Sequence, residues 1–171
     1  LDAAAAAIAF GACVTAGQRC SATSRVFAER SIADTLSERL VRLFRGIAIG
    51  HSSDPGAFMG PLISRSARER HAKVLELAAA DGAQALVAGG PCEGPRPGHY
   101  VRPSLHRLRA HDRASRYQSE EHFLPDAFVL EVDSTEQGIA LLDATDFGLV
   151  ASVFTRDRAI YERAARTLRV G

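Results

Sequence analysis

Residues 24–43 read SRVFAERSIADTLSERLVRL and combine the two patterns that decide the fold. The first six residues form a short apolar-centred run that is typical of a strand. From Ser31 onward the large apolar residues recur at helical spacing, so that one face of a helix carries Ile32, Leu36, Leu40 and Leu43. Ser31 is the expected N-cap of that helix. A strand that leads directly into an amphipathic helix indicates an α/β fold.

The rest of the chain repeats this alternation. Further helices are expected at residues 2–13, from Ser64 or Ser66 to Gly82, from Thr135 to Asp143 and from Asp157 to Leu168. Further strands are expected at residues 84–88, 100–105, 127–132 and 149–155. Loops rich in Gly and Pro separate these elements. The order predicts an α/β fold with a largely parallel sheet flanked by helices, and residues 1–171 are expected to be one domain or part of one.

Composition excludes several classes of protein. The chain has 171 residues, 46% of them hydrophobic, and its net charge of +1 gives no electrostatic reason to expect a nucleic acid or a membrane as partner. The three cysteines lack disulfide-framework or zinc-site spacing, so we expect no metal and a reducing, cytoplasmic setting. The chain starts at Leu1 and ends at Gly171 within what looks like an element, so we expect a longer protein, truncated here at both ends.

The segment that carries chemistry is residues 16–21, AGQRCS. Cys20 follows a glycine turn and precedes the first strand, a placement that suits a reactive thiol. A thiolate attacks a carbonyl carbon readily, and covalent attack divides one difficult step into two easier ones. Arg19 could favour the thiolate or face the solvent. On these residues alone, a catalytic thiol and a small buried hydrophobe both stay open as interpretations of Cys20.

Five stretches together favour the catalytic interpretation. They are FGACVTAGQRCSATSR at 10–25, GPLIS at 60–64, GHYVRPSL at 98–105, EEHFLP at 120–125 and FGLVASVFTRD at 147–157. In order and approximate spacing they resemble the aldehyde dehydrogenase superfamily over essentially the whole chain. The first contains the Gly-Gln-x-Cys element, whose cysteine is the nucleophile in that superfamily. The pairing of AGQRC with Phe58-Met59-Gly60 is similar to the succinylglutamate-semialdehyde branch.

The resemblance implies a mechanism and site residues. Cys20 attacks a small aldehyde to form a thiohemiacetal, hydride passes to the nicotinamide of NAD or NADP, and water hydrolyses the resulting thioester to the acid. The backbone N–H of Cys20 matches one oxyanion donor. Glu121 matches the glutamate that binds a ribose hydroxyl of the cofactor, and Phe123 the aromatic residue beside the nicotinamide ribose. The resemblance also implies a homo-oligomer.

The chain departs from the family pattern at three positions. Leu124 stands where the family has glycine, Asp126 where an apolar residue is usual, and Asp143 where asparagine is common. The glycine-rich phosphate-binding segment, the general-base glutamate and the oxyanion-hole asparagine lie N-terminal to the cysteine in this family. We therefore expect the cofactor-binding domain to lie outside this chain, and residues 1–171 alone to have little or no dehydrogenase activity.

Two alternatives stay open. The first is a degenerate or truncated paralogue that acts only as an interaction module. The second is a thiol redox protein that uses Cys13 and Cys20, although a separation of seven residues is not typical of a redox pair. Cys13 is expected to pack in the core, because it lies among apolar residues of the first helix.

Overall fold

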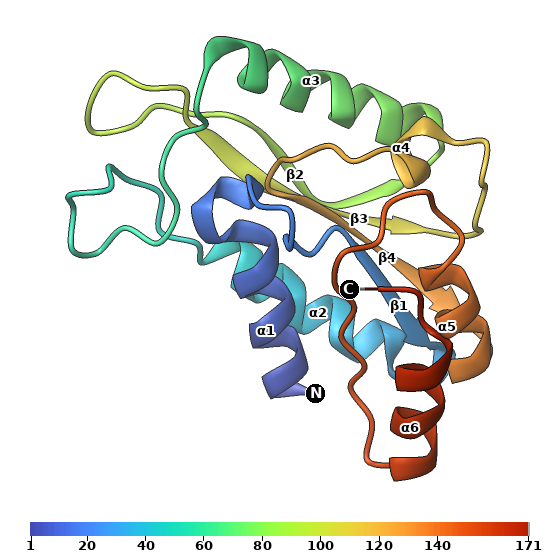
Figure 1. The fold of residues 1–171 in the computed structure, drawn as a ribbon. Helices are drawn as coiled ribbons and strands as arrows, with labels where there is room; N and C mark the ends of the chain where they lie inside the picture. Colours follow the sequence, from blue (N-terminus) through green and yellow to red (C-terminus); the bar gives the residue numbers. More distant parts are fainter. Residues whose placement is uncertain (171) are drawn as a thin grey trace.

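The computed structural model describes residues 1–170, which form one four-stranded sheet with helices on both faces (Figure 1). In chain order the elements are α1 (Asp2–Cys13), the 3-10 helix η1 (Val14–Gly17), β1 (Arg25–Glu29), α2 (Arg30–Arg45), α3 (Arg65–Ala80), β2 (Gln84–Pro91), β3 (Val101–Leu108), α4 (Arg116–Ser119), β4 (Asp126–Val132), α5 (Thr135–Leu142) and α6 (Arg158–Thr167). This order confirms the predicted α/β class. η1 and α4, which are only four residues each, were not predicted.

The strands lie in the order β1-β4-β3-β2. β4 pairs in parallel with both β1 and β3, whereas β2 and β3 form an antiparallel pair at one edge. The prediction of a largely parallel sheet is therefore confirmed. The antiparallel pair arises because a loop without a crossover helix joins β2 to β3, so that the chain reverses direction.

The two faces of the sheet are covered by different helices (Figure 1). α3 and α4 lie over one face, and α1 and α2 lie over the other. The predicted apolar face of α2 is confirmed at Leu36 and Leu40, whereas Ile32 and Leu43 are exposed and Phe44 is buried in their place. Full burial of a side chain such as Leu40 contributes about 2 kcal/mol. The helix nevertheless starts at Arg30, directly after β1, and no side chain caps it, so the prediction that Ser31 is its cap was wrong.

Other helix starts follow the expected chemistry more closely. Oγ of Ser64 accepts a hydrogen bond from the N–H of Ala67 (3.1 Å), and Oδ1 of Asp157 accepts one from the N–H of Ala159 (2.8 Å). Both are N-caps: Asp157 was predicted as one, and Ser64 is the correct choice between the two predicted starts, Ser64 and Ser66. At α5 the cap is Ser134, one residue before the Thr135 that the sequence suggested.

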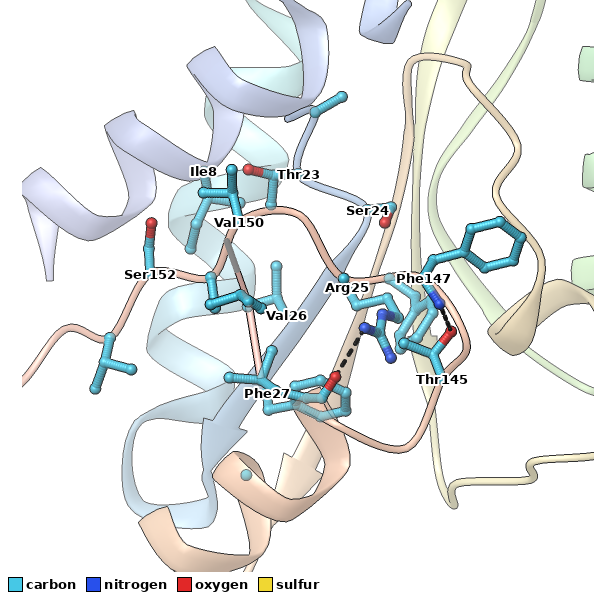
Figure 2. Close-up of a pocket in the computed structure, with 18 of the residues that line it drawn as sticks. Ile8, Thr23, Ser24, Arg25, Val26, Phe27, Thr145, Phe147, Val150 and Ser152 are labelled. Carbon is cyan, nitrogen blue, oxygen red and sulfur yellow. Dashed lines mark hydrogen bonds between the residues drawn. The ribbon is translucent and has the colours of Figure 1, made fainter. Parts of the chain in front are cut away.

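The strand predicted at residues 149–155 is absent. This segment pairs with no strand within residues 1–170, and Leu149, Val150 and Phe154 are 48%, 58% and 56% exposed. The prediction was wrong because apolar and β-branched side chains suit a strand, whereas a strand also needs a neighbour to hydrogen-bond with. The segment runs beside β1 without joining it, so that β1 forms the edge of the sheet (Figure 2).

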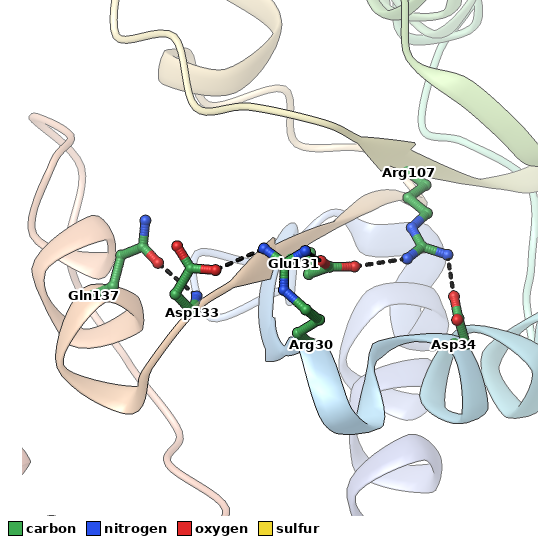
Figure 3. A network of polar contacts seen from close by, with 6 residues as sticks. All are labelled: Arg30, Asp34, Arg107, Glu131, Asp133 and Gln137. Atoms are coloured by element: carbon green, nitrogen blue, oxygen red, sulfur yellow. Dashed lines mark hydrogen bonds and ion pairs between the residues drawn. The ribbon is translucent and has the colours of Figure 1, made fainter.

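An ion-pair network ties α2 to the ends of β3 and β4 (Figure 3). Arg107 of β3 donates to Glu131 of β4 (2.9 Å) and to Asp34 of α2. Arg30 adds ion pairs to Glu131 (3.2 Å) and Asp133 (2.6 Å). Because Arg30 is largely exposed, its pairs contribute little to stability, and the partly buried Arg107–Glu131 pair is the stronger one.

Two further observations concern the described residues 1–170. None of their helices combines the length and the apolar character needed to cross a membrane. Their His, Cys, Asp and Glu side chains form no group of three that could hold a metal ion.

Candidate functional site

Two segments that precede neighbouring strands meet at the end of the sheet where those strands begin. They are the cysteine loop, residues 14–24, and the acidic loop, residues 118–125. β1 and β4 pair in parallel, and the N–H of Phe128 donates to the carbonyl of Ser24 (3.0 Å). Because adjacent parallel strands begin at the same end of a sheet, the segments that lead into them come together there.

The cysteine loop starts with a left-handed stretch of backbone. Three consecutive residues have positive φ, namely Thr15 (54°), Ala16 (53°) and Gly17 (65°). A tight turn follows, in which the N–H of Ala22 donates to the carbonyl of Arg19 (3.0 Å). Cys20 occupies the second position of this turn with an exposed side chain, and its own N–H donates to no group within residues 1–170. The loop therefore offers a thiol and a free backbone donor side by side.

The left-handed stretch should be strained at its non-glycine residues. L-residues in this conformation cost about 1–2 kcal/mol each, and β-branched threonine is a poor fit. Thr15 is exposed, so Thr15→Gly removes little packing and is expected to raise the free energy of unfolding by about 1 kcal/mol. Urea or thermal unfolding of the complete protein measures this change. The matched control is Thr35→Gly at an exposed position inside α2, which should lower stability instead. A loss of stability in Thr15→Gly would contradict the assignment of strain.

Three contacts hold the cysteine loop in place. Oε1 of Gln18 accepts a hydrogen bond from the N–H of Ile63 (3.0 Å), and the N–H of Thr23 donates to the carbonyl of Gly11 (3.2 Å). Gly17 lies against the acidic loop so closely that a Cβ at this position would be 2.2 Å from the carbonyl oxygen of Leu124. Three of the sequence motifs, at 10–25, 60–64 and 120–125, are therefore in direct contact.

The acidic loop presents one free carboxylate. Glu120 is engaged by Arg116, whose Nε lies 2.6 Å from its carboxylate, and this hydrogen bond lowers the pKa of Glu120. Glu121 is exposed and forms neither a hydrogen bond nor an ion pair within residues 1–170. Phe123 is 37% exposed and has positive φ (60°). The available acceptor is thus Glu121, with the aromatic surface of Phe123 two residues away.

Cys20, Glu121 and Phe123 line the same pocket, an open space of ≈ 720 Å³. The pocket continues between β1 and residues 145–152, where Figure 2 shows Val26 and Phe27 facing the segment that carries Val150. Across this part, the guanidinium of Arg25 donates to the carbonyls of Leu141 (3.4 Å) and Leu142 (3.1 Å). All three site residues named from the sequence are brought to one cavity.

Comparison with known proteins identifies the family. The sequence model described as "Aldehyde dehydrogenase family" matches residues 1–171. The chain belongs to the aldehyde dehydrogenase family. It is 36% identical over its whole length to a betaine aldehyde dehydrogenase of Cereibacter sphaeroides, and 29% identical to a 1-pyrroline-5-carboxylate dehydrogenase of Bacillus subtilis. The chain spans 35% and 32% of those two proteins, about a third of their length.

Solved structures agree with this assignment. An NAD-dependent aldehyde dehydrogenase of Sinorhizobium meliloti superimposes with a TM-score of 0.91 at 30% identity, over 99% of this chain and 33% of that one. A betaine aldehyde dehydrogenase of Staphylococcus aureus, solved in complex with NAD+, gives a TM-score of 0.89 at 29% identity, over 98% of this chain and 33% of that one. The fold expected from the resemblance is therefore confirmed.

The departures from the aldehyde dehydrogenase pattern fit the fold. Leu124, in place of the family glycine, does not have positive φ, which falls on Phe123 instead. The Leu124 side chain is 4% exposed and belongs to the core. Asp143 is the C-cap of α5 and accepts a hydrogen bond from the N–H of Arg169 (3.2 Å).

The third departure, Asp126, is the centre of a buried polar network. Its carboxylate accepts a hydrogen bond from the hydroxyl of Ser104 and lies 3.2 Å from Nδ1 of His106. The Tyr117 hydroxyl lies 2.9 Å from the same His106 nitrogen. Burial alone would raise the pKa of Asp126, but the hydrogen bonds from His106, Ser104 and Tyr117 hold it below its ordinary value. Asp126 is therefore an ionised acceptor inside the core, with the His106 ring 3.2 Å away.

Asp126 stands out in the sequence, but the residues that surround it were not predicted. Ser104 and His106 lie two residues apart on β3, so both point to the face that carries α3 and α4. Tyr117 approaches them from α4, which was not predicted. The signal that could have revealed the network was the pair Ser104 and His106, two residues apart in a predicted strand, together with an aspartate next to another predicted strand, at residues 127–132.

The buried residue His71 should make the stability of the protein depend on pH. Burial lowers the pKa of His71 below its ordinary value of 6.5, since charging it in the core is costly, although Asp126 partly offsets this. As the pH falls below 6.5, His71 therefore takes up a proton in the unfolded chain before it does so in the folded chain. The contribution of His71 to the free energy of unfolding is complete above pH 6.5 and declines below it, by at most about 1.4 kcal/mol per pH unit. Thermal unfolding between pH 7.5 and 5.5 should show a smaller decline in His71→Leu than in the wild type. His51→Gln is the control, and an equal effect of both variants would contradict the assignment.

The other cysteines differ sharply from Cys20. Cys13 is fully buried, as predicted, and burial raises its pKa to about 12. Cys92 is half-buried, and burial raises its pKa as well. None of the three forms a disulfide. A redox pair of Cys13 and Cys20 gains no support from this geometry, because a buried thiol that stays protonated neither attacks nor resolves a disulfide.

Proposed function

We propose that the complete protein oxidises an aldehyde to a carboxylic acid with NAD+ or NADP+, and that Cys20 is its nucleophile. The observation that carries this proposal is the exposed Cys20 thiol in one pocket with Glu121 and Phe123. Relatives about three times as long as this chain are aldehyde dehydrogenases. Residues 1–171 would supply part of the catalytic domain, and the remaining segments would supply the cofactor-phosphate site and the general base.

Cys20 performs the covalent chemistry in this proposal. Its thiolate sulfur bonds to the aldehyde carbon, and the negative charge that develops on the carbonyl oxygen faces the free N–H of Cys20. A second donor would come from outside this chain. After hydride leaves the thiohemiacetal carbon, a thioester links the acyl group to Cys20. Water then attacks that thioester, the acid is released and the Cys20 thiolate is restored.

The pocket fits the nicotinamide–ribose half of the cofactor. The free carboxylate of Glu121 can accept hydrogen bonds from vicinal ribose hydroxyls, and the exposed part of Phe123 offers a flat apolar surface next to it. When bound, the nicotinamide supplies the acceptor for the hydride. A betaine aldehyde dehydrogenase with 29% identity to this chain binds NAD+, which supports NAD+ as the first cofactor to test.

The test is an assay of the complete protein for reduced nicotinamide with NAD+ and with NADP+. Betaine aldehyde, glutamate semialdehyde, succinylglutamate semialdehyde and simple aliphatic aldehydes form the substrate panel. Reduced cofactor that appears only when aldehyde is present would support the proposal. If no aldehyde gives turnover although Cys20 is alkylated readily, the proposal is contradicted and the alternative of a non-catalytic interaction module is favoured. A homo-oligomer and a cytoplasmic location stay predictions, which light scattering and cell fractionation check.

A further inference from the structure

One set of buried side chains fixes both ends of the acidic loop. Tyr117 precedes residues 118–125 and Asp126 follows them, and His106 joins the two across the base of the loop. Nδ1 of His106 lies 2.9 Å from the Tyr117 hydroxyl and 3.2 Å from the Asp126 carboxylate. Tyr117 is 2% exposed, His106 3% and Asp126 4%. We refer to Tyr117, His106 and Asp126 as the buried clamp.

The first end of the loop depends on Tyr117. The His122 ring stacks on the Tyr117 ring, with centroids 5.7 Å apart and an interplanar angle of 17°. Nε2 of His122 lies 2.9 Å from the Tyr117 carbonyl, and Nε of Arg70 donates to the His122 carbonyl (3.2 Å). Glu121 is bonded to His122, so the direction of its backbone follows from these contacts.

The second end of the loop depends on Asp126. Its N–H donates to the carbonyl of Leu124 (2.8 Å), and the N–H of Ser104 donates to the carbonyl of Pro125 (3.0 Å). The Leu124 carbonyl is also the group that lies against Gly17 of the cysteine loop. A displacement of Asp126 would therefore move the Leu124 carbonyl, through which the acidic loop contacts the cysteine loop.

We propose that Asp126 is a positioning residue, which acts through His106 and Tyr117 to hold the acidic loop so that Glu121 and Phe123 can bind the nicotinamide ribose. The inference rests on the proposed function, because the roles of Glu121 and Phe123 belong to it. An ionised carboxylate only accepts hydrogen bonds: the Ser104 hydroxyl donates to Asp126, and the His106 ring lies 3.2 Å from it while also contacting the Tyr117 hydroxyl. Removal of the charge of Asp126 weakens both contacts, which loosens both ends of the loop at once.

The principal variant is Asp126→Asn in the complete protein, because asparagine keeps the shape and removes the charge. Calorimetric titration should give a dissociation constant for NAD+ about tenfold higher than that of the wild type. Hydrogen–deuterium exchange of the amides in residues 118–125 should be faster. The alkylation rate of Cys20 without cofactor should be unchanged, since the turn that carries Cys20 has its own contacts with Gly11 and Ile63.

The matched control is Val129→Ala. Val129 is fully buried on the same strand, but its side chain points to the opposite face from Asp126. Its truncation lowers stability by leaving a cavity without touching the buried clamp. The dissociation constant for NAD+ and the exchange of residues 118–125 should both stay at wild-type values. Equal effects of Val129→Ala and Asp126→Asn would overturn the inference.

A third variant separates positioning from packing. The combined substitution Asp126→Val, His106→Phe and Tyr117→Phe replaces the buried polar groups with apolar ones of similar size. Such replacements often restore stability. We expect the unfolding temperature to return towards that of the wild type while the dissociation constant for NAD+ stays raised. A stable variant with wild-type affinity for NAD+ would overturn the inference.

Failure of the inference can be told apart from failure of the proposed function. The proposed function fails if the wild-type protein neither binds NAD+ nor oxidises any aldehyde. Unchanged exchange of residues 118–125 in Asp126→Asn overturns the positioning role whether or not the wild-type protein binds NAD+. Faster exchange together with a raised dissociation constant supports it.

Discussion

Cys20→Ala in the complete protein is expected to lower the rate of aldehyde-dependent NAD(P)H formation by at least about a thousandfold. The proposed route passes through a bond between the Cys20 sulfur and the aldehyde carbon, and alanine offers no atom that could form it. Cys20 is exposed in a turn, so its truncation should cost little stability. Calorimetric titration should show that the variant still binds NAD+, because the residues assigned to the ribose, Glu121 and Phe123, are unchanged.

Two other thiols provide the controls for this result. Cys92→Ala removes a half-buried thiol in the loop between β2 and β3 and should leave kcat/KM near the wild-type value. Cys13→Ala removes a fully buried thiol and should lower the unfolding temperature while most of the activity is kept. A Cys20→Ala variant that retains its rate would refute the covalent route, whichever aldehyde is used.

The sequence carries most of the information about the individual elements. The burial of Leu36 and Leu40 in α2 and the cap at Asp157 follow from local chemistry, and the structure confirms them. Residues 149–155 are a segment whose structure the local pattern did not predict. Their side chains suit a strand, but strand formation depends on a partner with free backbone groups, and the composition of the segment says nothing about that partner.

The candidate site shows the same division. Cys20, Glu121 and Phe123 could be named from motifs, because each motif is a short continuous run of residues. Their meeting in one pocket depends on the parallel pairing of β1 with β4, strands that lie about 100 residues apart in the chain. The buried clamp could not be named in this way, since its members come from three separate elements and only Asp126 stood out from the family pattern.

The cysteine loop and the acidic loop are in contact at Gly17, and the methyl group of an alanine at this position should push them apart. Gly17 has φ +65°, and a Cβ added there would lie 2.2 Å from the oxygen of Leu124 and 2.6 Å from the nitrogen of Pro125. These are backbone atoms that cannot rotate away. Gly17→Ala is therefore expected to lower the free energy of unfolding by about 2–4 kcal/mol, from left-handed strain together with overpacking.

The functional effect of this substitution should be equally large. Displacement of the acidic loop by about 1 Å can lower kcat/KM about a hundredfold, because Cys20 and the cofactor-side residues must keep a fixed separation. Gly82→Ala is the matched control: Gly82 has a similar φ (+69°), but no atom lies within 4 Å of the added Cβ. It should lose only about 1 kcal/mol of stability from strain and keep full activity. Unfolding experiments and steady-state kinetics on both variants distinguish the two outcomes. If Gly17→Ala behaved like Gly82→Ala, the close contact between the cysteine loop and the acidic loop would not be what sets the geometry of the site.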